Sequence, residues 1–144
     1  MLIGEFLHTI DAKKRISLPA KFRKEIGKGA VITKGLDKCL FVYPVSEWKN
    51  FAEWLSALPM GQKDKRDLTR IFLASASEVE SDKLGRILIP DYLKKYAELE
   101  EKAVICGMYK RLEIWNEKRW EKYREETEKQ ADILAEKMGE MGIA

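Results

Sequence analysis

Two arginines occur in the same local sequence, at a spacing that could serve anion binding. Arg15 follows Asp11 by four residues and precedes a proline by four. Arg86 stands at the same distances from Asp82 and from the next proline. A guanidinium presents a planar set of N–H donors that matches phosphate oxygens and the O6/N7 edge of guanine. The two aspartates could equally form ion pairs with the arginines within a turn. These roles are compatible, because a carboxylate can hold a guanidinium in position.

The basic residues around the two arginines are unevenly distributed. Seven Lys and Arg lie between Asp11 and Lys28, against two acidic residues, and such a segment is typical of a polyanion-binding protein. A solvated charged surface explains the charge alone equally well. We expect the first segment to face the polyanion and the second mainly to complete the fold. The candidate contact residues are Lys13, Lys14, Arg15, Arg23 and Lys24 in the first segment, and Lys83 and Arg86 in the second.

The two arginine motifs belong to a longer internal repeat. At a constant offset of 71 residues, the Asp, Arg, Ile and Pro of the two motifs are identical, and the aliphatic and basic positions correspond. After small insertions, the triplet Ala-Val-Ile and a tryptophan also recur. We therefore divide the chain into a first copy with its following helix at 1–54, a helical connector at 55–72, a second copy with its following helix at 73–126, and a helical tail at 127–144.

Each copy has the pattern of four short strands and one short helix. In the first copy, Pro19 predicts the start of a helix that ends before Gly27, because proline fits the first turn and glycine ends a helix well. The apolar runs at 30–33 and 40–43, which a turn containing Gly and Asp separates, predict a hairpin. Ser46 is expected to cap the helix that follows.

Apolar stripes predict further helices outside the strands. Apolar residues recur at helical spacing from Trp48 to Leu58, again at about 65–73, and more loosely from Trp120 to Met141. Packing onto the core explains most such stripes. A subunit interface is the alternative, and a terminal helix with Trp and Met on one side would suit it.

The predicted fold class is mainly β with flanking helices, which is an α+β arrangement. A unit of about 45 residues exposes too much surface for its own core to stabilise it. Two copies in one chain solve this problem by burying one against the other. We therefore expect a pseudo-symmetric β-barrel built from the interleaved halves of two tandem repeats.

The sequence offers little for catalysis or metal binding. The single imidazole, His8, lies in a predicted strand, whereas nucleophilic catalysis needs a base beside a nucleophile. Cys39 and Cys106 are isolated, so we expect small buried residues rather than a zinc site, which needs about four ligands at short spacings. There is no P-loop and no G-x-G-x-x-G motif. We expect no enzyme, no catalytic or metal-binding residues, no cofactor and no small-molecule substrate.

Composition predicts a globular protein of the cell interior. Of the 144 residues, 45% are hydrophobic and 35% are charged, which is typical of a folded domain. No stretch approaches the ~20 uninterrupted apolar residues that a membrane span needs. The first residues lack the basic and long apolar segments of a signal peptide. We therefore expect a cytoplasmic location and no membrane partner.

The repeated motif resembles that of known transcription factors. The pattern Asp-x-x-x-Arg-[Ile/Val]-x-[Ile/Leu]-Pro-x-x-[Phe/Leu]-[Arg/Lys] resembles the AbrB-like (SpoVT-AbrB) proteins, whose chains normally carry one copy and dimerise. Two copies in one chain resemble the MraZ family, over residues 2–126. This resemblance implies a swapped-hairpin, double-psi type of AbrB-like barrel and a DNA-binding regulator of transcription. It also implies that Arg15, Arg23 and Lys24 contact DNA.

The resemblance implies partners as well. Members of the family bind short direct repeats in the DNA upstream of their own division and cell-wall operon, and they assemble into rings of several subunits. We therefore expect double-stranded DNA and further copies of the chain as partners, association with the nucleoid, and repression of the operon. Weak contacts of single subunits would add up across a ring. The alternative is a protein-interaction or assembly module, or an antitoxin-like partner, that does not bind DNA.

The first motif departs from the pattern at one position. The residue before the arginine is Lys14 in the first motif and Gly85 in the second. Glycine permits a positive φ, which is costly for lysine. We therefore expect the first turn to differ from the second.

Overall fold

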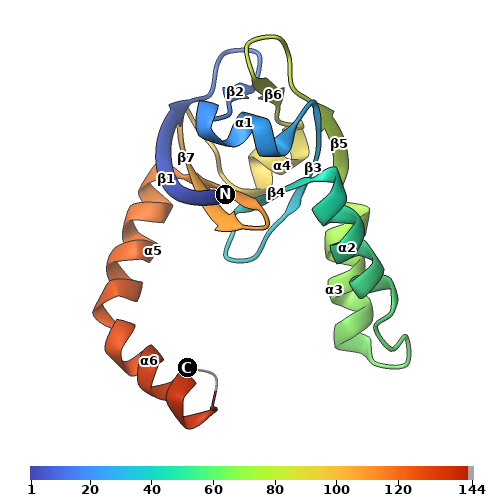
Figure 1. The fold of residues 1–144 in the computed structure, drawn as a ribbon, viewed down its shortest axis with the longest axis vertical. Coiled ribbons are helices and arrows are strands. Elements are labelled where there is room, and N and C mark those ends of the chain that lie inside the picture. Colours follow the sequence, from blue (N-terminus) through green and yellow to red (C-terminus); the bar gives the residue numbers. More distant parts are fainter. Residues whose placement is uncertain (143–144) are drawn as a thin grey trace.

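The computed structural model describes residues 1–142, and its elements repeat one order twice (Figure 1). Each copy runs strand, strand, helix, strand, strand, helix, and one further helix follows each copy. The first half comprises β1 (Leu2–Thr9), β2 (Arg15–Ser17), α1 (Ala20–Ile26), β3 (Gly29–Lys34), β4 (Leu40–Pro44), α2 (Val45–Ser56) and α3 (Lys63–Ala74). The second half comprises β5 (Ser77–Glu80), β6 (Arg86–Leu88), α4 (Asp91–Tyr96), β7 (Lys102–Tyr109), β8 (Leu112–Asn116), α5 (Glu117–Lys129) and α6 (Ala131–Glu140).

The strands of the two copies alternate instead of forming two separate units. One antiparallel sheet has the order β1-β7-β8-β4-β3-β5, and a two-stranded ribbon joins β2 to β6. Three of the five neighbouring pairs in the sheet, and the ribbon itself, therefore join one copy to the other. The interleaving that the repeat predicts is confirmed.

The fold class is α+β, and the strands curve around a common core (Figure 1). Within residues 1–142 the edge strands β1 and β5 do not pair with each other, so the sheet is open between them. The β2–β6 ribbon lies at one end of the molecule, and a bridge between Ile10 and Ile16 connects it to the end of β1. Helical residues outnumber strand residues, because α2, α3, α5 and α6 extend beyond the sheet.

The ribbon rests on a core made of equivalent residues of the two copies. Ile16 faces Ile87 across the ribbon, and both are buried, as are the next inward residues, Leu18 and Ile89. Phe22 of α1 packs into the same cluster. Burial of an aliphatic side chain of this size stabilises the fold by about 1.5–3 kcal/mol. The buried side chains of the ribbon therefore anchor the segment that carries the two arginines to the core.

The first helix and the following hairpin form where the sequence predicts them. α1 begins directly after Pro19, and Gly27 ends it with a φ of 68°. Strands β3 and β4 pair in antiparallel register. The prediction that Ser46 caps the next helix was wrong. Pro44 is the N-cap and α2 begins at Val45, two residues earlier than a cap at Ser46 implies, because the fixed φ of Pro44 leads directly into the helix.

Four helices form two arms on opposite flanks of the sheet, both extending away from the ribbon (Figure 1). In the α2–α3 arm, Leu55 and Phe72 pack into an aromatic cluster on the sheet. The α5–α6 arm is held by Glu5 of β1, whose carboxylate accepts hydrogen bonds from Trp120 and Arg124. α6 has no buried residue. The apolar residues at the far end of this arm therefore face solvent in a single chain.

Both cysteines are small buried residues, as predicted. Cys39 and Cys106 are free thiols, and burial raises the pKa of each. In the described part of the chain, no three His, Cys, Asp or Glu residues group so as to hold a metal ion. Over the same residues, no helix is both long enough and apolar enough to cross a membrane.

Candidate nucleic-acid interface

Each arginine lies in a tight loop between two strands, and we call Asp11–Arg15 and Asp82–Arg86 the arginine loops. In the first loop, the N–H of Asp11 donates to the carbonyl of Arg15 at 3.0 Å, and the N–H of Lys14 donates to the carbonyl of Asp11 at 3.0 Å. The corresponding distances in the second loop are both 2.9 Å. The two loops therefore share one backbone conformation.

The aspartate of each loop holds its arginine through both carboxylate oxygens. Oδ1 of Asp11 accepts the backbone N–H of Arg15 at 2.9 Å, and Oδ2 accepts the Nε–H at 2.8 Å. Asp82 holds Arg86 in the same way, at 2.9 and 2.7 Å. The hydrogen bond from the backbone N–H, and then that from the guanidinium, lower the pKa of both carboxyl groups. Both carboxyl groups are therefore ionised at neutral pH.

Lys14 adopts the left-handed backbone conformation that glycine adopts in the second loop. Its φ is 64°, against 76° for Gly85, so the prediction that the first turn differs was wrong. This conformation costs a non-glycine residue about 1–2 kcal/mol. Two hydrogen bonds offset the cost, one from the Lys14 N–H to Asp11 and one from the N–H of Ile89 to the Lys14 carbonyl. The Lys14 ammonium also forms an ion pair with Asp91 at the start of α4.

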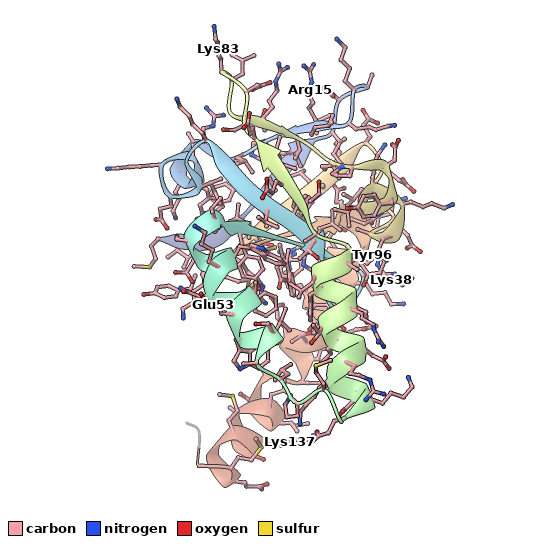
Figure 2. All side chains as sticks on the ribbon, turned by 90° about the vertical axis from the view of Figure 1, so that its right-hand side faces the viewer. Arg15, Lys38, Glu53, Lys83, Tyr96 and Lys137 are labelled. Carbon is pink, nitrogen blue, oxygen red and sulfur yellow. The ribbon has the colours of Figure 1, made fainter. Side chains whose placement is uncertain are left out.

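The ribbon joins the two arginine loops to each other. Antiparallel pairing places Arg15 and Arg86 on neighbouring strands. The carbonyls of Lys14 and Gly85 each accept an N–H from the residue that follows the opposite strand, at 2.8 and 2.9 Å. Figure 2 shows Arg15 and Lys83 at the same end of the molecule, pointing away from the helical arms. The two loops thus form one surface, which we call the loop end.

Both guanidinium groups remain accessible beside their aspartates. The side chains of Arg15 and Arg86 are 30% and 27% exposed. Each donates its Nε–H to the aspartate, and within residues 1–142 the Nη groups form no hydrogen bond to the protein. The free edge of a guanidinium suits a ligand with two adjacent acceptors, such as a phosphate or a guanine. Since the aspartates already restrict the arginines, binding would remove little further conformational freedom.

Comparison with known proteins identifies the family. The model of one family, described as "MraZ protein, putative antitoxin-like", matches residues 1–71 and again residues 72–139. The chain belongs to the MraZ family. Its similarity to individual members extends over almost its whole length. It is 48% identical to "Transcriptional regulator MraZ" of Caldanaerobacter subterraneus subsp. tengcongensis, 49% to that of Thermoanaerobacter pseudethanolicus and 48% to that of Moorella thermoacetica, each over 99% of this chain and 100% of the relative.

The other basic residues predicted for this MraZ-family chain lie on or beside the loop end. Lys13 and Lys83 are exposed on the loops themselves. Arg23 and Lys24 lie in the last turn of α1. Both are exposed to solvent, and the Nε–H of Arg23 also donates to the carbonyl of Leu18 at 2.9 Å. Arg23 is therefore tied to the end of β2.

Sequence reasoning overlooked two neighbours of these residues. Asp91 neutralises Lys14, although the two belong to different copies. The repeat contains a signal for this ion pair. Lys14 replaces the glycine found at Gly85, and Asp91 replaces the alanine found at Ala20, so the two charged residues occur together. The second is His8, which the sequence places in a strand but does not connect with Arg23. Burial, and then the charge of Arg23, lower the pKa of His8, so this imidazole is neutral at pH 7.

The two arginine loops have the same backbone geometry and similar exposure, and they differ in the charge around them. The first copy supplies more basic residues, but both arginines are half-buried, held by an aspartate and placed on one ribbon. That the first copy faces the polyanion while the second mainly completes the fold therefore stays a prediction from charge.

Proposed function

We propose that this protein is a sequence-specific DNA-binding regulator of transcription that contacts DNA with its loop end. One observation carries the proposal: Arg15 and Arg86 lie on one ribbon, each fixed by an aspartate and each with its Nη groups free within residues 1–142. The names of the relatives, which are transcriptional regulators, support the same function.

The loop end has the chemistry for both parts of DNA recognition. The major groove of B-DNA admits a two-stranded ribbon, and a guanidinium can bind O6 and N7 of guanine there. The exposed Lys13, Lys24 and Lys83 would contact phosphates, which position a protein without specifying sequence. Each phosphate neutralised adds about 0.9 to the slope of log affinity against log salt. Binding should therefore weaken steeply as salt rises.

We propose further that copies assemble head to tail through the two helical arms. The arms leave opposite flanks of the sheet (Figure 1), and they differ in charge. α3 holds four Lys and Arg against two Asp, whereas α6 holds one Lys against three Asp and Glu. Exposed apolar residues accompany these charges: Trp54 on the first arm, and Leu134 and Met138 on the second. A contact between two different surfaces forms a ring when the rotation closes.

Such an assembly would explain binding to short direct repeats. Neighbouring copies in a ring are related by a rotation, so their loop ends meet successive DNA segments in the same direction. Two-fold dimers read inverted half-sites instead. Each linked contact raises the effective concentration of the next, so weak single contacts produce firm binding. On DNA upstream of its own division and cell-wall operon, such a complex would act as a nucleoid-associated cytoplasmic repressor.

Footprinting on the DNA upstream of the protein's own gene tests this function. Wild type should protect several short, regularly spaced segments, and Arg15→Ala should protect none at the same concentration. Lys110→Ala removes an equal charge from the exposed turn between β7 and β8, outside the loop end and both arms. It is the matched control and should protect as wild type does. Protection by Arg15→Ala equal to that of wild type would contradict the proposal.

The same experiment distinguishes the second candidate, an assembly or antitoxin-like module. The family's description as antitoxin-like favours keeping this candidate in the test. An assembly module would give intact oligomers by light scattering and no protected DNA at any salt concentration. Protected segments that disappear with Arg15→Ala would exclude it.

A further inference from the structure

The side chain of Arg23 crosses from the first copy onto the second arginine loop. A Cβ atom placed on Gly85 would lie 2.7 Å from Cδ and Cζ of Arg23 and closer still to its Nε. The guanidinium of Arg23 therefore rests directly on the loop backbone, in the space that only glycine leaves open. The partner that Gly85 accommodates is thus a residue far from it in sequence.

Arg23 and the second loop also share one point of attachment. The Nε–H of Arg23 donates to the carbonyl of Leu18 at 2.9 Å, and the N–H of Leu18 donates to the carbonyl of Gly85 at 2.9 Å. Leu18 is fully buried. The second loop therefore lies between the side chain of Arg23 and a buried residue of the core, and we call this arrangement the Arg23 clamp.

The first loop has a different contact at the equivalent place. Lys14 carries a side chain where the second loop has Gly85, so no arginine could lie on the first loop in the same way. Its own ammonium instead reaches Asp91 at the start of α4 in the second copy. Each arginine loop is thus tied by one long basic side chain to the opposite copy.

We propose that Arg23 is a positioning residue for Arg86, holding the second arginine loop for DNA contact instead of binding a phosphate independently. The proposal rests on the proposed function, because it assigns the route by which one residue of the loop end acts. Gly85 is then required for the space that it leaves to Arg23. The turn itself does not require glycine, since Lys14 forms the same turn in the first loop.

A double-mutant cycle measured by fluorescence anisotropy tests the proposal. The labelled duplex comes from the region upstream of the protein's own gene, and the variants are Arg23→Ala, Arg86→Ala and the double variant. If Arg23 acts through Arg86, each single change weakens binding about tenfold. The double variant then binds only slightly more weakly than Arg86→Ala alone, because coupled residues are not additive. Two independent phosphate contacts would instead weaken binding by the product of the single factors, and this result would overturn the proposal.

The slope of log affinity against log salt concentration is a second measurement, and a loss of stability alone would not change it. Removing one independent phosphate contact reduces the salt slope by about one. We expect the slope of the double variant to equal that of Arg86→Ala. Lys24→Ala, in the same turn of α1, is the matched comparison: combined with Arg86→Ala it should multiply the two weakening factors and reduce the slope further. The same behaviour from Arg23→Ala would contradict the proposal.

Gly85→Asn should break the contact between Arg23 and the second loop by a change in the loop instead of in Arg23. Asparagine tolerates the left-handed conformation, and its Cβ would displace the flexible Arg23 side chain without obstructing the backbone. Gly85→Asn should weaken binding as Arg23→Ala does, even if Arg23→Ala lowers stability. Wild-type affinity for Gly85→Asn would overturn the positioning role. The proposed function fails by a separate result, namely wild-type binding by Arg15→Ala.

Discussion

Asp11 holds Arg15 at two points, the backbone N–H at 2.9 Å and the guanidinium Nε–H at 2.8 Å. The carboxylate thereby orients the free edge of the guanidinium outward while much of the side chain stays buried against the ribbon. A negative charge at a surface proposed to bind DNA is unfavourable in itself. Its presence in both loops is explained if orientation of the arginine matters more than local charge.

Asp11→Ala therefore has opposite expected effects under the two explanations. Charge alone predicts tighter DNA binding, because one negative charge is removed. Orientation predicts binding about tenfold weaker, because Arg15 is released from both hydrogen bonds that fix it. Anisotropy with the upstream duplex measures the difference. Glu100→Ala, which removes an exposed acid outside the loops, is the control for charge. Equal or tighter binding by Asp11→Ala would refute the orienting role.

Lys14 allows the cost of its backbone conformation to be measured. Lys14→Gly removes the left-handed strain of about 1 kcal/mol, and also an exposed ion pair that is worth about 0–1 kcal/mol. Lys14→Ala removes the ion pair but keeps the strain. We expect the free energy of unfolding in urea to be about 1 kcal/mol higher for Lys14→Gly than for Lys14→Ala. Equal values for the two variants would show that the turn is not strained.

His8 predicts a decrease in stability at mildly acidic pH. Burial and the charge of Arg23 place the folded-state pKa of His8 below its unfolded value of 6.5. The unfolded chain therefore binds a proton first, and stability falls as the pH drops from above 6.5 through the lowered pKa. Melting temperatures between pH about 8 and about 5 should show this decrease, and His8→Gln should reduce it. An unchanged pH dependence in His8→Gln would contradict the assignment.

The position of Arg23 can be determined from the same imidazole. Because the charge of Arg23 is the second cause of the lowered pKa, Arg23→Ala should raise the pKa of His8 toward its ordinary value. Titration of the His8 ring protons by NMR measures this shift. Lys24→Ala, one residue along α1, should leave the titration almost unchanged. An equal effect of both substitutions would mean that Arg23 has no special proximity to His8.

The apolar end of α6 predicts the assembly behaviour. Leu134 and Met138 are 40% and 43% exposed and lie four residues apart on one helix face. Replacing both by Asp should leave the far-UV circular dichroism unchanged and reduce the oligomer to single chains in light scattering. Affinity for tandem repeats should fall toward that for one repeat. Leu36→Asp, which replaces a similarly exposed apolar residue outside both arms, in the turn between β3 and β4, is the control and should leave the oligomer intact.

The internal repeat made much of this architecture predictable. Identical residues at a constant offset imply two equivalent units, and the small size of each unit requires them to share a core. The pairing of Ile16 with Ile87 across the ribbon follows from that symmetry. The shared α+β fold and the equivalence of the two arginine motifs could therefore be inferred from sequence.

Contacts between the copies could not be predicted in this way. The contact of Arg23 with Gly85, and that of Lys14 with Asp91, depend on how the halves interleave in space. The conformation of Lys14 was mispredicted for a related reason. Propensity disfavours a positive φ for lysine, but hydrogen bonds within the loop and from the end of the opposite strand decide the turn. Comparison of the two copies shows that the departures at Lys14 and Asp91 occur together, but it does not show that these two side chains meet.

The DNA affinity of the variant that lacks both loop arginines is the decisive measurement for the loop end. Anisotropy titrations would compare Arg15→Ala/Arg86→Ala with wild type on a duplex that carries the tandem upstream repeats. Circular dichroism and light scattering would confirm that fold and assembly are retained. We predict binding weaker by at least about a hundredfold, since two contacts are removed from every copy in the assembly. A folded, assembled variant that binds this duplex as tightly as wild type would show that the loop end is not the DNA-binding surface.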